Sequence, residues 1–64
     1  MSRRMAYAAR VISLDGVVTT HLTRGSDARS ALTNLRRQLL GRWSRIEVGL
    51  GEGAEFRALA EVSR

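Results

Sequence analysis

The chain has 64 residues, which is enough for one small domain near the lower size limit for a single hydrophobic core. It contains no cysteine, so a disulfide framework and a thiolate metal site are excluded, and this composition fits a reducing cytoplasm. No segment approaches the roughly 18 consecutive apolar residues of a transmembrane helix, so we expect no membrane-spanning segment.

The net charge of +5 arises from eleven basic residues, all of them arginine, against six acidic ones. Residues 1–45 hold nine arginines and two aspartates, whereas residues 46–64 hold two arginines and four glutamates. This asymmetry points to an anionic partner or to self-association of opposite ends. We expect residues 1–4 to form a basic arm, whose order the sequence leaves open, and residues 5–64 to form one domain.

The first structural signal is a β-hairpin. Residues 5–14 and 17–24 are rich in valine, isoleucine, threonine and tyrosine, and Asp15-Gly16 separates them. An Asp-Gly pair between two such runs is the strongest short-range signal for a hairpin. The segment therefore predicts two antiparallel strands joined by a two-residue loop.

That loop fixes a register, which pairs Leu14 with Val17 and Arg10 with His21. One face of the hairpin then carries Tyr7, Ala9, Val11, Val18 and Leu22. The opposite face carries Ile12, Leu14 and Val17 near the turn. Because neither face is polar throughout, we expect this hairpin to lie in the middle of a sheet or beneath a partner.

The segment from Ser26 to Gly41 has the period of an amphipathic helix. One narrow stripe along it contains Ala28, Leu32, Leu35 and Leu39. Ser26 or Asp27 can cap the first turn, and Gly41 stands where a left-handed residue ends a helix. We expect the stripe to pack on a sheet.

Residues 44–50 and 54–62 alternate apolar and polar side chains as strands do. A three-residue turn at residues 51–53 places Val48 opposite Phe56 and gathers the apolar side chains on one face. A helix over residues 54–62 is the alternative, because AEFRALAEV also has good helix propensity.

The order of hairpin, helix and hairpin predicts an α+β domain, ββαββ, with a four-stranded sheet and one helix on one face. This order resembles the β-grasp architecture of ubiquitin-like proteins and of small immunoglobulin-binding bacterial domains. The resemblance implies that the first and last strands lie parallel at the centre of the sheet. It covers residues 5–63, concerns topology only and implies no function.

No group of residues forms a convincing reactive site. His21 has Arg10 as its expected cross-strand neighbour, which does not orient it as a base. Asp15 and Asp27 are expected to serve the turn and the helix cap. The glycines of residues 49–53 lack the spacing of a phosphate loop. We therefore identify no catalytic, cofactor-binding or metal-binding residue, and we expect a protein that is not an enzyme.

One helix covers only one face of a four-stranded sheet, so the other face is expected to expose Ile12, Leu14, Val17 and Leu59. This surface suggests a cytoplasmic protein-interaction module that forms a homo-oligomer or binds a partner protein. The arginine-only composition also suits a phage product that acts on a host factor. Trp43 has two interpretations, which are packing against the core and exposure for recognition.

The alternative hypothesis is electrostatic binding of nucleic acid. Arginines on the helix strip and the N-terminal arm would contact phosphates with little sequence preference. The residues concerned are Arg3, Arg4, Arg29, Arg36, Arg37, Arg42 and Arg45.

Overall fold

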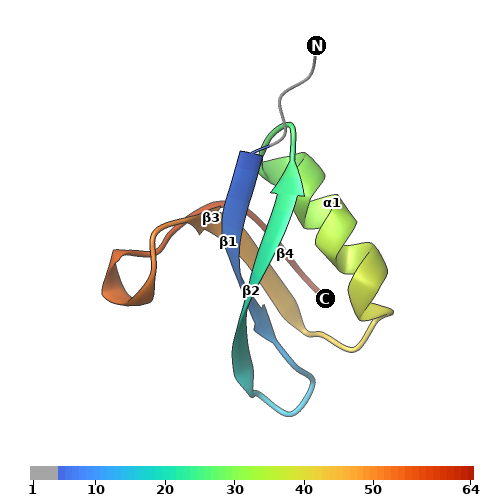
Figure 1. The fold of residues 1–64 in the computed structure, drawn as a ribbon. Helices are drawn as coiled ribbons and strands as arrows, with labels where there is room; N and C mark the ends of the chain where they lie inside the picture. Colours follow the sequence, from blue (N-terminus) through green and yellow to red (C-terminus); the bar gives the residue numbers. More distant parts are fainter. Residues whose placement is uncertain (1–4) are drawn as a thin grey trace.

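The computed structural model describes residues 5–64 and confirms the α+β class, with four strands and one α-helix in that range (Figure 1). Its elements are β1 (Met5–Ile12), β2 (Val18–Gly25), α1 (Ala28–Leu39), β3 (Arg45–Leu50), the 3₁₀ turn η1 (Gly53–Glu55) and β4 (Arg57–Ser63). The C-terminal segment is a strand, as predicted, and not the alternative helix. Within the described range, no helix is both long enough and apolar enough to cross a lipid bilayer.

The strands form one sheet in the order β2-β1-β3-β4, with every neighbouring pair antiparallel. In the β-grasp architecture β1 and β4 would be central and parallel, so the expected strand order is wrong. The connection after α1 explains the difference. The backbone N–H of Ser44 donates to the carbonyl of Ile12 at 2.7 Å, and the Ser44 hydroxyl also bonds this carbonyl. These bonds seat β3 directly beside β1 and leave β4 at the edge.

The β1–β2 loop contains three residues and not the predicted two. Ser13 N–H donates to the carbonyl of Val17 at 2.9 Å, and Gly16 N–H donates to the carbonyl of Ser13 at 3.1 Å. Gly16 has a φ of 89°, which completes a type I turn followed by a left-handed bulge residue. The resulting register pairs Ile12 with Val18, which differs from the prediction by one residue.

This one-residue shift reverses the faces of β2. Thr19 and Thr23 share a face with the buried residues of β1, while Val18 and Leu22 lie on the opposite face. The prediction that Val18 and Leu22 face the core is therefore wrong. Thr23 is buried because its hydroxyl donates to the carbonyl of Ala31 in α1 at 2.9 Å.

The β3–β4 connection is also longer than the predicted turn and includes η1. Val48 pairs with Ala60, whereas Gly49 pairs with Ala58, so Leu59 is an extra residue in β4. The expected pairing of Val48 with Phe56 is wrong for this reason. An added Cβ at Gly49 would lie 1.8 Å from the carbonyl oxygen of Arg57, so the close approach of the two backbones here requires glycine.

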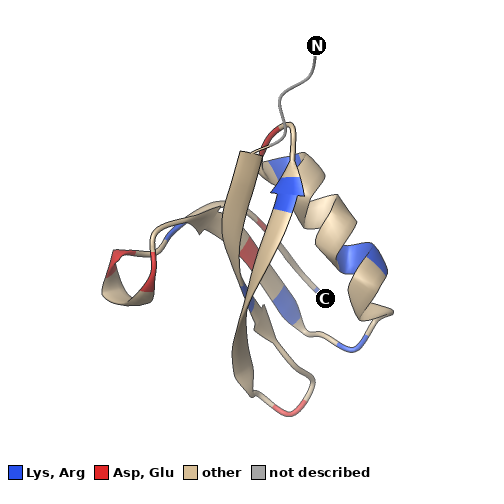
Figure 2. Ribbon diagram, in the orientation of Figure 1, with Lys and Arg blue, Asp and Glu red and all other residues tan. Residues whose placement is uncertain are grey.

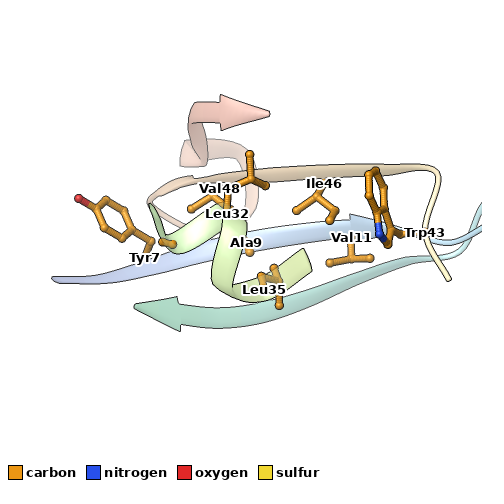
Figure 3. Close-up of a cluster of buried hydrophobic side chains, with 9 residues drawn as sticks. Tyr7, Ala9, Val11, Leu32, Leu35, Trp43, Ile46 and Val48 are labelled. Atoms are coloured by element: carbon orange, nitrogen blue, oxygen red, sulfur yellow. The ribbon is translucent and has the colours of Figure 1, made fainter. Parts of the chain in front are cut away.

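The core lies between α1 and one face of the sheet (Figure 3). Its buried members are Tyr7, Ala9, Val11, Ala31, Leu32, Leu35, Trp43, Ile46 and Val48. The helix contributes its predicted apolar stripe, and β1 and β3 contribute their helix-facing residues. Trp43 is only 3% exposed, which confirms its interpretation as a core residue.

Two aspartates have the structural roles expected for them. Asp27 Oδ1 accepts a 2.8 Å hydrogen bond from the backbone N–H of Ser30 and caps α1, and this bond lowers the pKa of Asp27. Asp15 accepts a hydrogen bond from the Ser13 hydroxyl, which lowers the pKa of Asp15 in the same way. At the other end of α1, Leu40 and Gly41 adopt left-handed conformations with φ values of 52° and 82°.

These aspartates predict a pH dependence of stability. Their pKa is lower in the folded chain than the ordinary value of 3.8, so the unfolded chain takes up protons first as the pH falls below about 4. Their stabilisation is therefore present above that pH and is lost below it. We therefore compare the urea midpoints of the wild type and of an Asp15→Asn/Asp27→Asn variant at pH 5 and at pH 3, about one unit on either side of the ordinary aspartate pKa. The midpoint of the wild type should fall more between these two pH values than that of the variant. Equal falls would contradict this assignment.

Candidate functional site

The open face is defined here as the side of the sheet opposite α1, and it has an apolar half and a charged half. The registers place Ile12, Val18 and Leu22 on the apolar half, which is formed by β1 and β2. Val18 is 57% exposed and Leu22 is 83% exposed. The charged half is formed by β3 and β4, where Glu47 and Glu61 lie opposite each other.

The hairpin strip comprises the apolar residues of this open face and of the adjoining loop: Ile12, Leu14, Val17, Val18 and Leu22. Leu14 is 70% exposed, Val17 is 55% exposed and Ile12 is half-buried. Three of the four residues proposed as an interface, Ile12, Leu14 and Val17, thus lie at one end of the β1–β2 hairpin. The fourth, Leu59, is exposed in the edge strand β4, two strands away from β1. Sequence reasoning missed Val18 and Leu22 because the alternation pattern allows either register.

A hollow of about 410 Å³ adjoins this strip, between the β1–β2 hairpin and the segment of residues 51–56. Arg10 holds that segment in place. Its guanidinium lies 4.5 Å from the centre of the Phe56 ring and donates a hydrogen bond to the carbonyl of Gly53. Leu22 and Phe56 both line the hollow. In Figure 1 the segment extends from the sheet on the side away from α1. No local sequence signal predicts this contact, because it depends on the bulge in β4.

The charged half of the open face is held by an ion-pair network. Arg45 Nη2 lies 3.2 Å from Glu47 Oε2 and 2.5 Å from Glu61 Oε2. A single arginine therefore neutralises two glutamates that would otherwise repel each other across the β3–β4 pair. Arg45 was a candidate phosphate contact, but here its guanidinium is engaged by two carboxylates.

The remaining arginines lie mostly on and around α1 (Figure 2). Arg29, Arg37 and Arg42 are exposed. The guanidinium of Arg36 lies 5.4 Å from the Trp43 ring centre, and that of Arg64 lies 4.7 Å from it, so two arginines cover this buried ring from solvent. The candidates Arg3 and Arg4 lie outside the described residues.

His21 lies opposite Ala9 and not opposite Arg10, again because the hairpin register differs by one residue. Its Nε2 lies 2.9 Å from the Thr19 hydroxyl, and the side chain is half-buried. In residues 5–64, no three histidine, cysteine, aspartate or glutamate side chains gather closely enough to hold a metal ion.

No protein-family model matches the chain, and neither a curated protein nor a solved structure shows significant similarity to it.

The Arg10 contacts predict a local effect on dynamics. In an Arg10→Ala variant, residues 51–56 lose both the cation–π contact and the hydrogen bond, which together stabilise the segment by about 1–2 kcal/mol. Amide hydrogen exchange in that segment should become about tenfold faster, since 1.4 kcal/mol corresponds to a factor of ten. The exposed Arg37→Ala variant is the control, and it should leave the segment unchanged. Equal exchange rates in the two variants would contradict the proposed role of Arg10.

Proposed function

We propose that the chain is a non-enzymatic, cytoplasmic protein-interaction module that binds a partner protein through the hairpin strip, which spans part of its open face and the adjoining loop. The observation that carries this proposal is the exposure of four large apolar side chains on one hairpin: Leu14, Val17, Val18 and Leu22. Soluble proteins rarely gather so much apolar surface unless another molecule covers it. These four are half of the eight large hydrophobic residues that are exposed within the described range.

The surroundings of the strip also suit a protein contact. Burial of an apolar centre supplies most of the binding free energy, while polar groups around it fix orientation. The Arg45 ion-pair network on the charged half supplies polar groups that are already held in place. The hollow next to Leu22 and Phe56 offers space for one side chain of a partner.

A retention experiment with matched variants tests this proposal. The immobilised wild type should retain a defined set of proteins from a nuclease-treated extract, and Leu14→Glu should lose that set because a charge in an apolar contact is costly. The matched control is Leu40→Glu, which alters another highly exposed leucine, at the end of α1. Leu40→Glu should retain the set. If Leu14→Glu retains the same proteins as the wild type, the hairpin strip is not the contact surface.

Nucleic acid is the second candidate partner, favoured by a separate observation. Residues 28–46 contain five arginines and no acidic residue, and four of these arginines are exposed on α1 and the following loop. Such a surface can neutralise phosphates, and its affinity would fall steeply with salt. The same experiment discriminates the two candidates. For this purpose the retained material is compared between treated and untreated extract. Material that is lost after nuclease treatment, but is still retained by Leu14→Glu from untreated extract, would favour nucleic acid over a partner protein.

A further inference from the structure

The outer edge of β2 is a second unpartnered feature of the sheet. Within the described residues, β2 pairs with β1 alone. Residues in an antiparallel ladder alternate between bonding the neighbouring strand and pointing away from it. Ser13 and Val17 form a hydrogen-bonded pair, so the alternation can be counted from them. The residues of β2 whose backbone N–H and C=O groups point away from β1 are Val18, Thr20, Leu22 and Arg24. The hydrogen bond from Asn34 Nδ2 to the Arg24 carbonyl, at 2.8 Å, agrees with this alternation.

The available part of this edge has defined limits. At one end, β2 begins at Val18, directly after the hairpin loop. At the other end, the Arg24 carbonyl already accepts a hydrogen bond from the Asn34 side chain. The stretch between these limits is residues 18–22, and its central residue, Thr20, points outward. A two-fold axis at Thr20 places a hydrogen-bonded pair at the centre of the contact, because the backbone N–H and C=O of Thr20 point outward, and this register uses the whole available stretch.

The two edges of the sheet differ in how they are protected. Natural edge strands avoid pairing with other chains by means of bulges and charged side chains. Strand β4 carries both, since Leu59 forms a bulge and Arg57 and Glu61 are charged. Strand β2 has no proline and no internal register shift, and its one charged side chain, Arg24, lies near its end, outside residues 18–22. Its edge is therefore the one suited to pairing.

We propose that a second copy of this chain pairs with β2 edge to edge, antiparallel, about a two-fold axis at Thr20. This register places Thr20 opposite Thr20 of the second copy, and Val18 opposite Leu22 of the second copy. Leu22, which is 83% exposed in one copy, is then covered by an apolar cross-strand neighbour. The two sheets join into one sheet of eight strands.

Charge complementarity supports the same register. In this register Arg24 of one copy and Arg24 of the second copy lie at opposite ends of the paired strands. They are eight strand positions apart, which corresponds to about 26 Å, so their charges do not repel each other closely. The same register directs each Arg24 toward the hairpin loop of the other copy, which contains Asp15. A groove of about 620 Å³, lined by Arg24, Arg37 and Asn34, lies between this end of β2 and α1. The groove can receive that acidic loop.

This inference goes beyond the proposed function and does not depend on it, because edge pairing covers Val18 and Leu22 from the side of the strand edge and leaves Leu14 and Val17 of the hairpin strip exposed. Light scattering or sedimentation over a wide concentration range tests it. The wild type and Thr20→Ala should form dimers. Thr20→Pro should be monomeric, because proline lacks the N–H that the central pair needs, whereas the edge position of Thr20 spares the fold of one copy. Circular dichroism checks that fold.

Paired charges test the register and do not rely on proline. Val18→Lys/Leu22→Lys should be monomeric because like charges then face each other, and Val18→Glu/Leu22→Lys should dimerise because each glutamate faces a lysine. A wild type that stays monomeric throughout overturns the inference. A dimer that survives in folded Thr20→Pro but is lost in Leu14→Glu also overturns it, and would show a face-to-face dimer through the hairpin strip instead.

Discussion

The structure depends on the packing of one twelve-residue helix against one face of a sheet that has two faces. Ala31, Leu32 and Leu35 of α1 are buried in one core cluster with residues of β1 and β3, and Trp43 closes this core just beyond the end of the helix. Within residues 5–64 no second α-helix covers the opposite face, and the chain has no cysteine for a disulfide. The exposed apolar residues of β1 and β2 are therefore a consequence of the topology, and the proposed interactions follow from them.

The length of the β1–β2 loop determines which residues of β2 lie on that face, and a difference of one residue reverses the two faces of β2. With a two-residue loop, Val18 and Leu22 would lie under the helix, and with the observed three-residue loop they lie on the open face. The helix side of β2 then carries threonines and a histidine, which hydrogen bonds accommodate: Thr23 bonds Ala31, and His21 bonds Thr19. Gly16, with its left-handed backbone, makes this turn possible.

Features governed by local chemistry were predictable from the sequence, and features governed by contacts between distant segments were not. The helix with its Asp27 cap and the first three strands follow from periodicity and capping. The last strand and the burial of Trp43 were each one of two interpretations that the sequence left open. The strand order depends on where Ser44 bonds β1, and the β3–β4 register depends on the bulge at Leu59. Both are properties of the assembled sheet. For the candidate site, Ile12, Leu14 and Val17 were predictable, whereas Val18, Leu22 and the contact of Arg10 with Phe56 were not.

The arginines show why net charge alone does not define a binding site. Arg10 and Arg45 hold parts of the open face in place, and Arg36 and Arg64 cover the indole of Trp43. These four guanidinium groups are engaged within the molecule. The charge left for an anionic partner is concentrated on the exposed arginines of α1 and its following loop, and this is a smaller surface than +5 suggests.

The most direct test of one-sided packing compares two leucines by urea unfolding at a protein concentration low enough to keep the chain monomeric. Leu35 is 2% exposed and Leu22 is 83% exposed. Leu35→Ala should lower the free energy of unfolding by about 2–5 kcal/mol, whereas Leu22→Ala should change it by about 0.5 kcal/mol or less. Losses of similar size in the two variants would show that the open face is covered within a single chain, and would contradict the account.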